Sequence, residues 1–140
     1  MTKDAVGIGV LGCGAFGGFA LSHMMGVEGV ELVGIGGTYP EASARATERF
    51  GVPDFGSPEQ LVAHPDVDLV YIATPPFLHY RQSMLALDAG KHVLCEKPLA
   101  LSLEQADEML AVAAERELLM VANLVQRYNP LYAPVQQVIA

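Results

Sequence analysis

Short apolar runs alternate with segments of helical spacing along the whole chain. The runs are continuously apolar rather than alternately apolar and polar, which indicates strands covered on both faces. Six are expected, the third being a turn plus a very short strand: residues 6–11, 30–35, 51–55, 68–73, 92–95 and 119–123. Helices are expected over residues 15–27, 40–50, 58–64, 76–88 and 103–113, with another starting at Pro130. This order predicts an α/β fold, a doubly wound parallel sheet in a single domain.

Composition narrows the class of protein. The chain has 140 residues, enough for one domain with a sizeable core. Acids number 16 against 8 Lys and Arg, so the net charge of −8 disfavours nucleic acid and anionic membranes as partners. No apolar run approaches the roughly 20 residues of a membrane span, and we expect a cytoplasmic protein. Cys13 and Cys95 lie far apart, outside any CxxC motif, so we expect no metal site.

The first expected strand runs into the glycine-rich segment GCGAFG, residues 12–17, which opens a helix. In that context the glycines have separate uses: Gly12 allows a tight turn, Gly14 lets a pyrophosphate approach the backbone, and Gly17 lets helix and strand pack closely. The amides at the helix N-terminus would face the phosphates. The alternative is a glycine-rich turn without a ligand. The expected cofactor contacts here are Gly12, Gly14, Ala15, Phe16 and Gly17.

The end of the second strand carries no carboxylate. NAD-binding domains usually place an acid there, about 20 residues after the glycine loop, on the adenosine ribose. Here the strand ends in Gly37 and Thr38. An acid would repel a 2′-phosphate, and Thr38 can donate a hydrogen bond to one, so the pattern favours NADP over NAD. Arg45 is a possible phosphate partner, or else a solvated surface residue.

Two further segments place polar residues with possible functional roles at or just after strand ends. The first, IATPPFLH, turns from a strand into a helix at two prolines, so Ala73, Thr74 and Pro75 are expected along a cofactor groove. His79 either borders the cofactor or packs the helix. The second, GKHVLCEKP, ends a strand in an acid and a base. Its lysine can hold a substrate oxygen, and Pro98 restricts the loop.

We expect four of these residues to converge on one sheet edge: Thr74, His79, Glu96 and Lys97. Lys97 is the candidate catalytic residue. Glu96 either pairs with Lys97 or reaches the cofactor ribose. The alternative for Glu96 and Lys97 is an ordinary loop ion pair.

The segments GCGAFG, IATPPFLH, GKHVLCEKP and NLVQRYNP, in this order, resemble the Gfo/Idh/MocA family, named for glucose-fructose oxidoreductase and inositol dehydrogenase. The resemblance covers nearly all of the chain and implies an NAD(P)-dependent oxidoreductase acting on a sugar, cyclitol or related polyol. It implies that Lys97 contacts nicotinamide and the reacting hydroxyl. It also implies that Asn123, with Gln126 and Arg127, lies where the chain leaves the cofactor domain. One departure is Gly37-Thr38, where the family commonly has Asp followed by Arg.

The resemblance also implies a division of the chain. Residues 1–122 would be the NAD(P)-binding Rossmann domain, and residues 123–140 the linker and start of a C-terminal substrate domain. Family members are more than twice as long and take most of the substrate pocket and a proton-transfer residue from that second domain. We therefore expect the isolated chain to bind cofactor without turnover, and to self-associate through its apolar tail as a homo-oligomer.

Two other functions fit parts of the pattern. One is a stand-alone, non-catalytic dinucleotide-binding module with a sensor or regulatory role. The other is an S-adenosylmethionine methyltransferase, which also has a glycine loop after its first strand. That class is disfavoured because it rarely needs a lysine like Lys97 and normally carries an acid at the end of the second strand.

Overall fold

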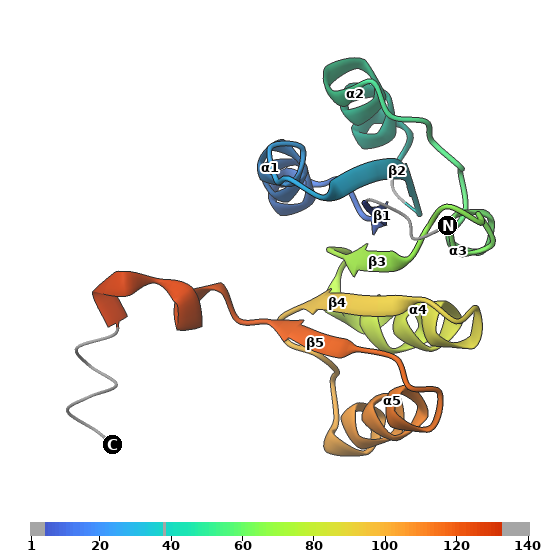
Figure 1. Cartoon of the computed structure of the whole chain (residues 1–140), viewed down its shortest axis with the longest axis vertical. Coiled ribbons are helices and arrows are strands. Elements are labelled where there is room, and N and C mark those ends of the chain that lie inside the picture. Colours follow the sequence, from blue (N-terminus) through green and yellow to red (C-terminus); the bar gives the residue numbers. More distant parts are fainter. Residues whose placement is uncertain (1–4, 38, 133–140) are drawn as a thin grey trace.

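The structure is a computed structural model, and it describes residues 5–37 and 39–132. Five parallel strands form one twisted sheet in the order β2-β1-β3-β4-β5 (Figure 1). The strands are β1 (Val6–Leu11), β2 (Val30–Gly36), β3 (Leu69–Ile72), β4 (His92–Glu96) and β5 (Met120–Asn123). The helices are α1 (Ala15–Met24), α2 (Pro40–Phe50), α3 (Pro58–Val62), α4 (Pro76–Asp88) and α5 (Leu103–Glu115). Two 3₁₀ helices follow, η1 (Val125–Tyr128) and η2 (Pro130–Tyr132).

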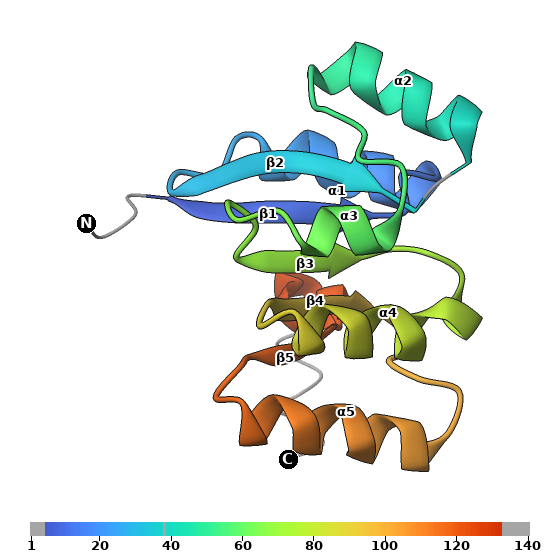
Figure 2. The same ribbon diagram turned by 90° about the vertical axis from the view of Figure 1, so that its right-hand side faces the viewer.

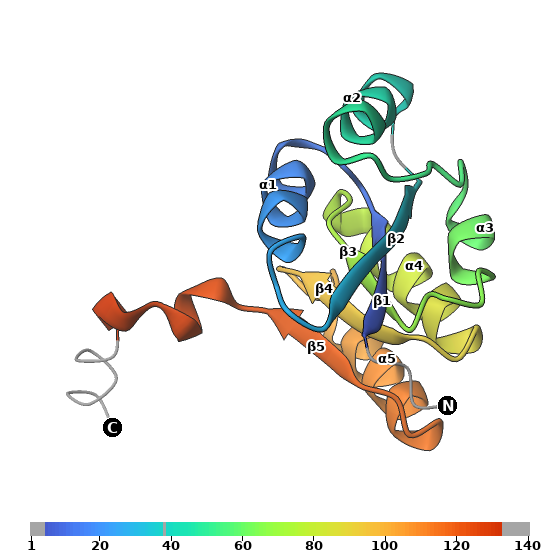
Figure 3. The same cartoon turned by 45° about the horizontal axis from the view of Figure 1, so that its top comes forward.

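Helices cover both faces of the sheet, which confirms the expected doubly wound fold. Figure 2 shows α3, α4 and α5 along one face, and Figure 3 shows α1 and α2 on the other. Neighbouring residues of one strand therefore enter different cores: Val10 packs with α1 and α2, and Leu11 with α3 and α4, both without exposed surface. Burial on both sides explains why the strands read as continuous apolar runs.

The expected elements differ from the structure in one strand and at several helix ends. The predicted third strand, 51–55, is a single parallel bridge between Asp54 and Ile35, so the prediction of six strands is wrong by one. Pro53 has no amide to donate, and the chain turns at Gly56, whose φ is 76°, so pairing stops after the carbonyl of Pro53 and the amide of Phe55 have bonded.

Helix ends also shift. The first helix stops at Met24 rather than residue 27, because the amide of Gly26 closes a turn on the carbonyl of His23. The predicted capping residues are confirmed: the Ser57 hydroxyl accepts a hydrogen bond from the amide of Gln60 in α3, and the Ser102 hydroxyl accepts one from the amide of Gln105 in α5. The helix predicted from Pro130 is a short 3₁₀ turn as far as Tyr132, and its continuation lies outside the described residues.

After β5 the chain runs away from the body of the sheet (Figure 1). Leu124, Val125 and Tyr128 are exposed there. Self-association through this tail stays a prediction, and its last part lies outside the described residues. No helix in the described ranges is long and apolar enough to cross a membrane.

The tightest contact in the fold joins α1 to the end of β1. A Cβ built on Gly17 would lie 2.0 Å from the carbonyl oxygen of Gly12. Gly12 has a φ of 91°, and its own Cβ would lie 2.8 Å from the backbone of Ala73 at the end of β3. Two strand ends and one helix therefore meet backbone to backbone, which only glycine allows.

We expect Gly17→Ala to lower the free energy of unfolding by about 1–3 kcal/mol, because the new methyl group overlaps a backbone oxygen that cannot move freely. Urea denaturation followed by circular dichroism measures this. The matched control is Gly18→Ala in the same helix, where a Cβ would meet nothing closer than the Cys13 oxygen at 3.9 Å. That variant should be as stable as the parent or up to about 1 kcal/mol more stable, from helix propensity. Equal stability of the two variants would contradict the close packing.

Candidate functional site

A groove of about 400 Å³ opens at the carboxyl edge of the sheet. Three segments line it: the glycine loop after β1, the end of β2, and the turn after β3. The lining residues are Gly12, Gly14, Ala15, Phe16, Gly37, Tyr39, Ala73, Thr74, Pro75 and Leu78. Eight of these are residues that the sequence singles out as cofactor contacts, and parallel strands bring them together because their carboxyl ends share one edge.

The glycine loop fits a phosphate group. Gly14 is exposed, and a Cβ built on it would have no heavy atom within 4 Å, so the groove side of the loop is open. Gly14 is also the N-cap of α1, whose first turn has no side-chain cap and no acidic residue. The backbone amides that begin the helix are therefore left for an anion, with the positive end of the helix dipole behind them.

Residue 37, directly after β2, is poorly suited to carry a side chain. Gly37 has a φ of 58°, and a Cβ there would lie 2.9 Å from Cγ of Pro58. An acid at this position is therefore disfavoured by backbone and space together, which agrees with its absence from the sequence. Thr38, the other residue expected here, lies outside the described residues. Arg45 does not line this groove and lies on α2.

Thr74 and His79 form the support beneath the groove. The Thr74 hydroxyl donates a hydrogen bond to Oε1 of Gln82 at 2.5 Å, which fixes the side chain of this lining residue. His79 is buried and does not line the groove. Its two ring nitrogens each lie 2.8 Å from a carbonyl oxygen, one of Thr74 and one of Pro98. His79 thus ties the end of β3 to the loop after β4, in which the Lys97–Pro98 peptide bond is cis.

Glu96 sits in a buried hydrogen-bonded cluster rather than in an ion pair with Lys97. Its Oε1 accepts from the Tyr71 hydroxyl at 2.7 Å and from Nδ2 of Asn123 at 2.5 Å. Burial raises the pKa of Tyr71, and the hydrogen bond to Glu96 and its charge raise it further, so the phenol stays protonated and donates. The cluster joins the ends of β3, β4 and β5.

Lys97 follows Glu96 directly and is exposed, with no ion pair in the part of the chain that the structure describes. Since Ile72 pairs with Cys95, the register sets Thr74 level with Lys97 on the neighbouring strand. Lys97 is not among the residues that line the groove at Gly14. It lies at the same sheet edge, with an exposed side chain.

Sequence reasoning missed three contributors. Tyr39 and Leu78 line the groove, and each lies next to a residue that was singled out. Tyr71 is the third. A signal for it exists in the sequence: it is the tyrosine in an otherwise aliphatic strand, LVYI, and a buried tyrosine hydroxyl needs a hydrogen-bond partner.

We expect Tyr71→Phe to lower the free energy of unfolding by about 1–3 kcal/mol, because it removes one of two donors from a buried carboxylate. Urea denaturation measures the loss. Tyr80→Phe is the matched control, since Tyr80 donates to Glu108 at 2.7 Å on the surface, where the loss should stay below about 0.5 kcal/mol. Equal effects of the two changes would show that the buried cluster adds nothing to stability.

Comparison with known proteins identifies the family of the chain. Residues 6–124 match the oxidoreductase family with an NAD-binding Rossmann fold, the Gfo/Idh/MocA family. The chain is 46% identical over 96 residues to 1,5-anhydro-D-fructose reductase from Ensifer adhaerens, covering 68% of this chain and 29% of that protein. It is 41% identical over 91 residues to D-xylose 1-dehydrogenase (NADP(+)) from Hypocrea jecorina, covering 65% of this chain and 23% of that protein.

A solved structure is similar over nearly the whole chain. It is a 3-ketoreductase from Actinomadura kijaniata in complex with NADP and TDP-benzene, with a TM-score of 0.90 and 34% identity, covering 96% of this chain and 42% of that one. The chain thus spans less than half the length of each of these proteins. By the family match over residues 6–124 and this structural similarity, the chain belongs to the Gfo/Idh/MocA oxidoreductase family and is an NAD(P)-binding Rossmann domain.

Proposed function

We propose that this domain holds NAD(P) for hydride transfer to or from a secondary alcohol or ketone of a sugar, cyclitol or related polyol. The observation that carries the proposal is the placement of an open glycine loop and an unpaired lysine along one sheet edge, on either side of the β3 turn. The names of the relatives support the substrate class, since two of them are a xylose dehydrogenase and an anhydrofructose reductase.

The residues at this sheet edge have different roles in the proposed reaction. The nicotinamide cofactor, when bound, supplies the hydride acceptor or donor. The amides around Gly14 would hold its pyrophosphate, and Ala73 and Pro75 would contribute to the wall of the groove beside it. The ammonium group of Lys97 donates a hydrogen bond to the substrate oxygen and stabilises that oxygen as its charge changes.

Hydrogen bonds on both sides of Lys97 support its backbone. Next to Lys97, the carbonyl oxygen of Pro98 lies 2.8 Å from a ring nitrogen of His79, whose other ring nitrogen contacts the carbonyl of Thr74. Before Lys97, the carboxylate of Glu96 accepts hydrogen bonds from Tyr71 and Asn123. Anchored neighbours of this kind help to position a side chain that acts electrostatically.

Residues 1–122 form the cofactor domain in this proposal, and residues 123–140 lead toward a substrate-binding part. The relatives are more than twice as long as the chain. Lys97 is exposed in the described structure, and we infer that other chain segments complete the sugar pocket and supply the proton-transfer group.

We expect Gly14→Leu to abolish NADPH and NADH binding while leaving the fold intact. A Cβ at this position would have no heavy atom within 4 Å, so we expect little loss of stability, but the leucine side chain would fill the space where the pyrophosphate would approach. Fluorescence titration measures binding, and thermal unfolding provides the control for the fold. Unchanged affinity for both cofactors would contradict the assignment of this loop.

We expect the 140-residue chain to bind the reduced cofactor and to give no detectable NADP- or NAD-linked oxidation of polyols such as D-xylose or inositol. The absorbance of reduced cofactor at saturating polyol is the measurement. Turnover by the chain would show that its own residues complete the pocket, and Lys97→Ala should then remove that turnover.

A further inference from the structure

His79 is buried at the carboxyl edge of the sheet and touches two loops there. The residue is 1% exposed and lies in the first turn of α4. Nε2 of its ring lies 2.8 Å from the carbonyl oxygen of Thr74, which lines the groove. Nδ1 lies 2.8 Å from the carbonyl oxygen of Pro98, the residue after Lys97. One ring therefore spans the segment that walls the groove and the segment that carries the lysine.

Both contacts of this ring require the nitrogen to be a donor. A carbonyl oxygen can only accept a hydrogen bond, whereas a neutral imidazole has one N–H donor and one nitrogen that accepts. A neutral ring can therefore bond to one of the two oxygens, and its bare nitrogen then faces the other oxygen at 2.8 Å, where the two lone pairs repel. A ring with a proton on each nitrogen donates to both oxygens.

Two other histidines of the chain have the opposite surroundings. Nδ1 of His64 accepts a hydrogen bond from the backbone amide of Asp66 at 3.3 Å. Nδ1 of His92 accepts one from the backbone amide of Leu119 at 3.0 Å. An accepting nitrogen must carry no proton, so these two rings are built to be neutral, whereas both nitrogens of His79 face oxygens.

The charges around His79 leave room for this state. Burial and the N-terminus of α4 both oppose a positive charge, but hydrogen bonds from a charged donor are about twice as strong as neutral ones, and the ring makes two. Burial raises the pKa of the Cys95 thiol to about 12, so it is uncharged, and it also raises the pKa of the Tyr71 phenol. Glu96 is the buried acid at this edge, and the acids of α3 and α5 are exposed. On the carboxyl-edge halves of the elements packed around α4, and on α4 itself, the ionisable residues are Glu59, Tyr71, Tyr80, Arg81, Cys95, Glu96, Lys97, Glu104, Asp107 and Glu108.

We propose that the His79 ring carries a proton on both nitrogens and acts as a clamp that positions the Lys97 segment against the wall of the groove. The inference rests on the proposed function, in which His79 touches neither cofactor nor substrate and is a positioning residue. When the pH rises and the ring loses one proton, one of the two hydrogen bonds is lost, and the two segments are no longer held together. The clamp is therefore complete on the acidic side of this transition and open on the basic side.

Nuclear magnetic resonance of the 140-residue chain with isotope-labelled histidine tests the charge directly. At neutral pH, both ring nitrogens of His79 should carry protons, whereas His64 and His92 should each show one bare nitrogen. Through-bond assignment identifies the signals, so this measurement needs no variant. A bare ring nitrogen on His79 at neutral pH would overturn the inference.

A titration toward basic pH tests the positioning role. The backbone amide signals of Thr74 and Lys97 should shift with the same midpoint as the His79 ring. Affinity for NADPH, measured by fluorescence, should fall about 2- to 10-fold across this midpoint, the range that one lost hydrogen bond covers. In His79→Gln, whose side chain has a single nitrogen and cannot bridge both oxygens, these amide shifts and this pH dependence should be absent.

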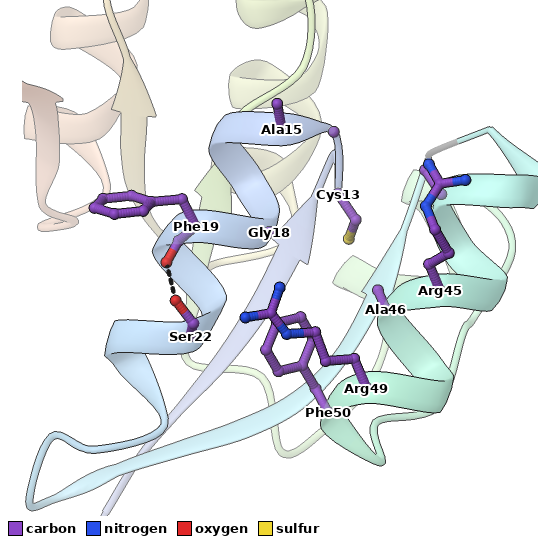
Figure 4. A pocket seen from close by; sticks show the side chains of 11 residues that line it. Cys13, Ala15, Gly18, Phe19, Ser22, Arg45, Ala46, Arg49 and Phe50 are labelled. Carbon is purple, nitrogen blue, oxygen red and sulfur yellow. Dashed lines mark hydrogen bonds between the residues drawn. The ribbon is translucent and has the colours of Figure 1, made fainter.

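His23→Gln is the matched control, because His23 is exposed on α1 and contacts one carbonyl oxygen. Its Nδ1 lies 2.9 Å from the carbonyl oxygen of Phe19, which also accepts a hydrogen bond from the Ser22 hydroxyl at 2.6 Å (Figure 4). This variant should keep the affinity and the pH dependence of the unaltered chain. If the Lys97 amide does not follow the His79 ring, the inference is overturned. If the unaltered chain binds neither NADPH nor NADH, the proposed function fails, whereas the ring protons and the amide shifts still decide the clamp.

Discussion

The contact between Gly17 and the carbonyl oxygen of Gly12 is the constraint on which the rest of the site depends. It presses the first turn of α1 against the end of β1, leaving no room for even one methyl group. The same loop touches the backbone of Ala73 at the end of β3. Because three backbones meet there, the amides of α1 are aimed at the carboxyl edge of the sheet, and Gly14 is left as the open point of the loop. This packing supports the phosphate site that we propose, without any charged side chain.

Parallel pairing of the strands also sets the position of Lys97 at this edge. The register of β3 and β4 puts Lys97 level with Thr74, two strands from the glycine loop. Hydrogen bonds at the strand ends prevent this edge from fraying: His79 bridges two loops, and Glu96 gathers donors from β3 and β5. Glu96 is thus a structural neighbour of the lysine, and the adjacent acid and base do not neutralise each other. The buried carboxylate of Glu96 joins neighbouring strand ends, and the exposed ammonium group of Lys97 forms no ion pair among the described residues.

Much of this was predictable from the sequence, because strands buried on both faces and glycines at fixed spacing are local signals. The alternation of apolar runs and helices correctly predicts the five strands of the sheet. The eight predicted groove residues follow from their positions at strand ends. The failures have non-local causes. Residues 51–55 have a strand-like composition, but Pro53 and Gly56 limit them to one bridge. The partner of Glu96 could not be read from its neighbours, since Tyr71 lies 25 positions away.

The end of β2 shows how packing limits the residues that can line the groove. At most strand ends of this kind, one acidic side chain contacts the ribose and selects NAD. Here the left-handed conformation of Gly37 and the close approach of Pro58 disfavour a side chain at residue 37. The absence of an acid takes away a repulsion toward a phosphate, but by itself it provides no attraction. Gly14 and Gly37 thus line the groove with backbone alone. The anion site that we propose at this edge therefore depends on the packing of backbone segments rather than on charged side chains.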